Sequence, residues 1–212
     1  MTVDTWRYFR EAHLRSIREL ALSCIFLNRT SFSGILCPTS GPIGGYSQGS
    51  QYKIDCRFTA STLVKRISQA SRLRDRVLFV DRNDWKQTLA KVEGMKYSSK
   101  EVFYYLDPPF YNKARRLYRF FFDVADHEAL HASLMHLQQP WLLSYDPAKQ
   151  ILDLYSHNGC GPKRVNLLYS ASASKNRGEA QELIITNVPT LPEETRLWRS
   201  SDEWEISRTQ LL

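Results

Sequence analysis

Apolar residues recur at two different spacings along the chain, and the spacing separates helical from extended segments. From Trp6 to Ile25 they return every three or four positions, with basic residues at the positions between them. This pattern predicts one amphipathic helix. Its basic face could lie near phosphates or simply face solvent. Helical spacing also marks three later segments, which are 59–72, 84–94 and 126–136.

Residues that start and stop helices support two of these assignments. Asp84 is a natural N-cap for the helix over 84–94, and Gly94 is a natural end. Pro147 suits the first position of a further helix, for which Asp146 would be the cap.

Short continuous apolar runs predict strands, because a strand covered on both faces needs few polar positions. Three such runs, at 76–81, 102–107 and 140–146, alternate with the helices. Two more, at 165–170 and 182–187, flank a polar loop at 171–180 that is too short for a crossover helix, so these two should be antiparallel. The order predicts an α/β fold with a mainly parallel sheet and a terminal antiparallel strand.

Composition divides the chain further. Residues 37–56 concentrate Gly, Pro and Ser, which indicates a long irregular loop. We therefore predict a helical and loop region over 1–75, an α/β region over 76–190 and a C-terminal appendage over 191–212, to which no role is assigned.

The charge balance points to polyanionic partners. The chain has 29 Lys and Arg against 22 Asp and Glu, a net charge of +7, which favours nucleic acid through phosphate neutralisation. No secretory signal or membrane-length apolar run occurs, and the four cysteines show no paired spacing. We therefore expect a cytoplasmic protein without membrane contact.

The residues with the clearest chemistry are Asp107-Pro108-Pro109-Phe110, directly after a predicted strand. Ligand sites of open α/β sheets gather at the carboxyl ends of strands. Two prolines hold the turn extended, so the Asp107 carboxylate and the Pro108 carbonyl can both accept hydrogen bonds. Two acceptors suit the two hydrogens of an exocyclic amino group, and Phe110 offers a face on which a base can stack.

This turn resembles the D-P-P-Y or D-P-P-F motif of adenine-specific DNA methyltransferases of the Dam type. Residues 27–34, LNRTSFSG, resemble that family's L-N-R-x-x-[YF]-N-G element, with Ser33 in place of the usual Asn. Leu143-Ser144-Tyr145-Asp146 resembles its strand-end motif, and 182–187 its final strand. The resemblance covers residues 6–187 and implies a Rossmann-like methyltransferase sheet with a small DNA-recognition insertion.

The resemblance implies roles for individual residues. Asp107, Pro108, Pro109 and Phe110 would form the catalytic turn. Asn28, Arg29, Phe32 and Ile35 would contact double-stranded DNA, with Phe32 filling the space of an extruded base. Asp81, Arg82 and Asp84 would lie beside the adenosine of S-adenosylmethionine, although Asp84 serves equally well as a helix cap.

One part of the family pattern is missing. The F-x-G-x-G loop that wraps the methionine part of the cofactor is absent, and with it the first two strands of the family sheet. A sheet with that gap would expose strand edges, so a second polypeptide is expected to supply the strands. The alternatives are an inactive DNA-binding remnant and methylation of RNA or of glutamine. No metal site is expected, because His127 and His131 lack the Glu and the third ligand of a zinc motif.

Overall fold

The computed structural model describes residues 1–95, 97, 102–112, 114, 120–156, 161–168 and 179–190. They divide into two compact units, the first comprising Met1–Val80 and the second beginning at Asp81. Residues 171–178 of the predicted loop at 171–180, together with Cys160 and the appendage over 191–212, lie outside the described residues. In the described part, no helix combines the length and the apolar character that crossing a membrane requires.

The first unit begins with two helices, where the apolar spacing predicts one over 6–25. Helix α1 spans Val3–Glu11 and α2 spans Ile17–Thr30. The break comes from Ser16, whose side chain accepts a hydrogen bond from the Glu19 backbone while the Glu19 carboxylate accepts one from the Ser16 backbone. This reciprocal capping box starts a new helix inside the periodic segment. The single-helix prediction is therefore wrong.

A small core holds this unit together. Trp6, Phe26 and Ile54 are buried against one another, and the Trp6 indole N–H donates to Ser31 Oγ at 3.0 Å. Residues 37–56 contain no helix or regular strand, as the composition predicts. The 3₁₀ turn η1 (Phe32–Gly34) follows α2, and α3 (Ala60–Ser71) occupies the predicted 59–72 segment. A second 3₁₀ turn, η2, spans Arg74–Arg76.

The predicted strand at 76–81 is absent from the structure. Residues 77–84 have no regular secondary structure, and Val77, Leu78 and Val80 are exposed. Apolar composition favours extended backbone, but a strand also needs a neighbour for its backbone hydrogen bonds. The described sheet offers none to this segment.

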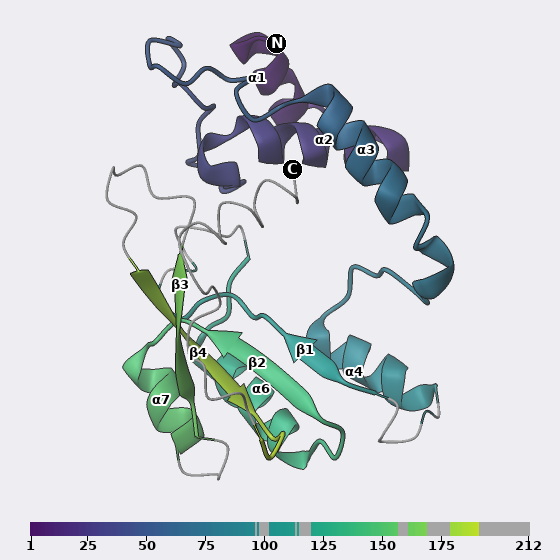
Figure 1. The fold of residues 1–212 in the computed structure, drawn as a ribbon, viewed down its shortest axis with the longest axis vertical. Coiled ribbons are helices and arrows are strands. Elements are labelled where there is room, and N and C mark those ends of the chain that lie inside the picture. The colour runs from purple at the N-terminus through teal and green to yellow at the C-terminus, as the bar shows by residue number, and fades with distance from the viewer. Residues whose placement is uncertain are drawn as a thin grey trace. The chain divides into compact units, whose positions relative to one another are not determined.

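The second unit is an α/β structure built on a mixed β-sheet (Figure 1). Its strands are β1 (Tyr104–Leu106), β2 (Trp141–Tyr145), β3 (Lys163–Leu168) and β4 (Glu179–Thr186), in the order β1-β2-β4-β3. β1 and β2 are parallel, whereas β4 runs antiparallel to both β2 and β3. The antiparallel relation of the last two strands is confirmed. Because β4 runs antiparallel to both β2 and β3, the strands β1, β2 and β3 share one direction. The described sheet is therefore mixed, with the last strand as its antiparallel strand, as the sequence predicts.

In the described part of the second unit, three helices accompany the sheet: α4 (Trp85–Gly94), α6 (Val124–His136) and α7 (Lys149–Ser156). Both α6 and α7 pack on one face of the sheet, because their buried residues share a core with Trp141, Leu143 and Tyr145, which alternate along β2. The resulting core contains Leu130, Leu134, Trp141, Leu143, Tyr145, Ile151, Tyr155, Leu183 and Ile185. This core fixes the carboxyl end of β2.

Candidate functional site

The Asp107–Phe110 turn lies where the sequence predicts, at the carboxyl end of a strand. β1 pairs in parallel with β2, with Leu106 opposite Leu143, so both strands end at one edge of the sheet. Asp107 follows β1 directly and is exposed, Pro108 is buried, and Phe110 is half-buried. The turn therefore presents a carboxylate to solvent from a fixed backbone.

Ser144 on β2 holds the Asp107 carboxylate. Its hydroxyl donates to Asp107 Oδ1 at 2.9 Å, and the Tyr105 hydroxyl lies 3.2 Å from Ser144 Oγ. Ser144 is buried, so the bond to Asp107 is made by a side chain with little freedom. Asp107 Oδ2 has no hydrogen bond to any residue that the structure describes, which leaves one oxygen for a ligand.

Asp146 fixes the other end of the turn. Its carboxylate accepts hydrogen bonds from the backbone N–H of Tyr111, at 2.7 Å, and of Asn112, at 3.0 Å. Asp146 is only 4% exposed. The expected capping role is therefore wrong: α7 begins at Lys149, and the Asp146 side chain binds the segment after Phe110 instead. Bonds to an ionised acceptor are strong, so β2 holds the turn through Ser144 and Asp146.

An aromatic cluster lies behind this segment. The rings of Tyr111 and Phe122 contact the ring of His127, and His127 Nδ1 lies 2.7 Å from the Tyr145 hydroxyl. Burial lowers the pKa of His127, although nearby carboxylates oppose the shift. Sequence reasoning did not select His127 as part of the site, because a histidine on a helix carries no signal of its partners.

The residues expected beside the cofactor are engaged within the chain. Asp81 forms an ion pair with Lys91 and accepts from the Asn83 amide. Asp84 caps α4 by accepting from the Lys86 backbone N–H at 2.8 Å, which confirms its role as a cap. Arg82 is exposed. In the described part of the chain, no hydrogen bond or ion pair joins 81–84 to the Asp107–Phe110 turn. These residues alone do not form a fitting site for S-adenosylmethionine.

In the first unit, the expected DNA-contacting residues surround the turn after α2. Phe32 is 55% exposed, and the Asn28 amide donates to the Gly34 carbonyl at 3.4 Å. Ile35 is half-buried. Ser33 has φ +55° and Gly34 has φ +72°. A left-handed conformation favours Gly and Asn, which explains why an Asn at the Ser33 position suits this turn.

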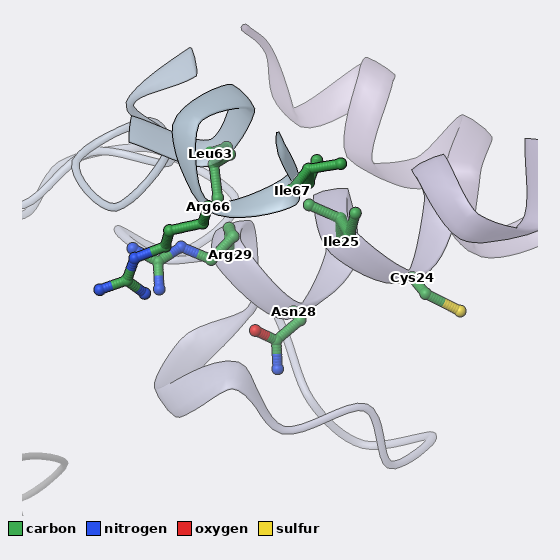
Figure 2. Close-up of a pocket in the computed structure, with 7 residues that line it drawn as sticks. All are labelled: Cys24, Ile25, Asn28, Arg29, Leu63, Arg66 and Ile67. Carbon is green, nitrogen blue, oxygen red and sulfur yellow. The ribbon is translucent and has the colours of Figure 1, made fainter. Parts of the chain in front are cut away.

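Arg29 lies at the rim of a pocket between α2 and α3. Figure 2 shows the residues that line this pocket, which has a volume of about 380 Å³: Cys24, Ile25, Asn28, Arg29, Leu63, Arg66 and Ile67. Arg29 Nε donates to the Arg57 carbonyl at 2.7 Å. Burial lowers the Arg29 pKa, and repulsion from Arg57 and Arg66 lowers it further. Sequence reasoning missed Arg57 and Arg66, since isolated basic residues on a loop and a helix form no motif.

Comparison with known proteins adds nothing to this description. No family model matches the chain, and no curated protein matches it either.

Proposed function

We propose that this chain carries the base-binding and catalytic half of a DNA adenine methyltransferase. The observation that carries the proposal is the Asp107–Pro109 turn, held at the end of β1 by Ser144 and Asp146. A prolyl residue has no N–H, so the turn presents acceptors to a ligand. The supporting resemblance includes an antiparallel final strand, which β4 supplies.

The residues of the turn would act by binding and orienting the base. A flipped adenine donates its two amino hydrogens to Asp107 and to the Pro108 carbonyl, while its ring stacks on Phe110. Two accepted hydrogen bonds draw the nitrogen lone pair out of conjugation with the ring and direct it away from the turn. A base that presents a carbonyl oxygen instead would face two acceptors and bind poorly. S-adenosylmethionine, when bound, supplies the electrophilic methyl group.

Part of the cofactor site would come from a second polypeptide. β1 is an edge strand of the described sheet, and Tyr105 on it is 64% exposed. Long-lived open edges are a liability in natural sheets. Strands added beside β1 would cover this edge and bring further residues to the carboxyl ends of the strands, where the 81–84 segment alone does not suffice.

A second candidate is a DNA-binding protein without catalytic activity. The engagement of Asp81 with Lys91 and of Asp84 in the α4 cap favours it, because both carboxylates already have partners. This candidate retains the DNA-contacting residues of the first unit.

Methyl transfer from isotopically labelled S-adenosylmethionine to unmethylated duplex DNA separates the two candidates. The chain is assayed alone and together with the polypeptide encoded immediately upstream. We expect labelled N6-methyladenine only in the mixture, and none with Asp107→Ala. Asp153→Ala is the matched control, since Asp153 is an exposed carboxylate on α7. Incorporation that survives Asp107→Ala would refute the catalytic role, and its absence from every mixture would favour the DNA-binding candidate.

A further inference from the structure

Three arginines from separate segments are neighbours in the first unit, because Arg29 Nε donates to the Arg57 carbonyl and Arg29 lines the same pocket as Arg66. Arg29 lies on α2, Arg57 precedes α3, and Arg66 lies on α3. Arg29 and Arg66 both line the α2–α3 pocket, and Figure 2 shows their side chains extending to the same side of it. The three residues are called the arginine cluster below.

Among the residues that the structure describes, no carboxylate forms an ion pair with any of the three arginines. The side chains of Arg57 and Arg66 make no hydrogen bond to a described residue, and all three arginines are only partly exposed. Like charges held close together repel and are stabilised by a bound anion.

The cluster also adjoins the turn that presents Phe32. A Cβ atom built on Gly34 would lie 3.7 Å from Arg57 Nη2 and 3.2 Å from Asn28 Nδ2. An exposed aromatic ring and a group of cations therefore occupy neighbouring positions at the end of α2. A ring that enters a base stack must have phosphates close to it, because the backbone of the duplex borders every base step.

We propose that Arg29, Arg57 and Arg66 bind one backbone phosphate of duplex DNA at the rim of the α2–α3 pocket. Guanidinium groups match phosphate geometry through paired N–H donors. The contact fixes the position of the DNA without selecting its sequence. This inference rests on the proposed function in taking DNA as the partner, and it adds a positioning contact that does not depend on the chemistry of methyl transfer.

The test measures how DNA affinity depends on salt, using fluorescence anisotropy with a labelled duplex oligonucleotide and no cofactor. The variant is Arg57→Gln with Arg66→Gln, which leaves the Arg29 bond to the Arg57 backbone in place. Loss of one phosphate contact lowers the slope of log Kd against log salt by about 0.9, so affinity at about 50 mM salt falls by roughly 3.5-fold more than at about 200 mM. Arg18→Gln is the control, because Arg18 is exposed on the first turn of α2 and does not line the pocket.

A second duplex of unrelated sequence completes the design. A phosphate contact predicts the same loss of slope on both duplexes, with little change for Arg18→Gln. An unchanged slope in the double variant overturns the inference, as does an equal loss in Arg18→Gln or a loss confined to one sequence. If wild-type chain binds no DNA, or the pocket accepts only an acidic protein segment, the inference also fails. If the double variant shows the expected loss of slope but no mixture transfers methyl groups, the phosphate site is supported and the catalytic proposal is refuted.

Discussion

Replacing Asp146 should destabilise the second unit by an amount that follows from its two hydrogen bonds. The carboxylate is 4% exposed and accepts from the backbone of Tyr111 and Asn112. Asp146→Ala leaves both N–H groups without this acceptor, and each buried unsatisfied group costs about 1–3 kcal/mol. Asn112 is exposed, so water can replace its partner in part. We therefore expect a loss of about 2–4 kcal/mol in the free energy of unfolding.

Asp146→Asn separates the loss of charge from the loss of volume. The amide keeps one carbonyl oxygen but turns its NH₂ group toward the second N–H donor, so one of the two bonds is lost. The expected loss is about 1–3 kcal/mol. Under the proposed function, the loosened turn also reduces methyl transfer in the reconstituted mixture, because Asp107 is no longer held at a fixed position.

Urea unfolding followed by circular dichroism measures both variants. The midpoint should fall while the slope against denaturant stays unchanged, which indicates a change in stability rather than in the denatured state. Asp153→Ala and Asp153→Asn serve as controls on α7, where the carboxylate is exposed. An Asp146→Ala protein whose stability lies within about 0.5 kcal/mol of wild type, the range of an ordinary surface substitution, would refute the assignment.

Three further predictions concern backbone strain, pH and buried hydroxyls. Ser33 has a positive φ, which Asn tolerates and β-branched residues avoid. Ser33→Asn should therefore stabilise the first unit by up to about 1 kcal/mol, and Ser33→Val should destabilise it. Equal unfolding midpoints for the two variants would contradict this. Burial lowers the pKa of His127 and of His131 from 6.5. As the pH drops below 6.5, these histidines become protonated in the unfolded chain before they do so in the folded protein, so the free energy of unfolding should fall. A stability that stays constant across this range, or a His127→Asn variant with the same pH profile as wild type, would count against that account. Tyr155→Phe should leave the free energy of unfolding unchanged or raise it, since the buried Tyr155 hydroxyl has no hydrogen-bond partner in the described part of the chain. Tyr145→Phe loses the bond to His127 and should lower the free energy of unfolding by about 1–3 kcal/mol. A Tyr155→Phe protein that is less stable in urea than Tyr145→Phe would refute the assignment.

Local patterns predict most of the elements correctly, and the failures share a cause. The Asp84 cap of α4, the helical spacing of α4 and α6, and the apolar runs of β1 and β2 depend on neighbouring residues alone. The break before α2 is also local, since Ser16 and Glu19 form a recognisable capping box, but the apolar period continues across it. The segment at 76–81 has the composition of a strand, whereas pairing depends on a neighbour that composition does not reveal.

The candidate site, too, could be predicted from the sequence only in part. The Asp107–Phe110 turn is a contiguous motif at a strand end, so its position could be predicted. Its supports could not, because Ser144 and Asp146 reach the turn only through the register of β1 against β2. The arginine cluster is also non-local, since three separate segments supply it. Sequence therefore identifies a contiguous motif more readily than the residues that hold it in place.

The place of β4 in the sheet bears on how the protein is synthesised. β4 is the last described strand in the chain, yet it lies between β2 and β3 and makes both of their antiparallel pairings. During translation β2 emerges roughly forty residues before its partner, as Leu142 pairs with Thr186. Until then, among the described strands, β2 has only β1 beside it and β3 has no partner. The sheet thus forms late and over a long sequence separation, which slows folding and leaves apolar strands open to chaperones in the nascent chain.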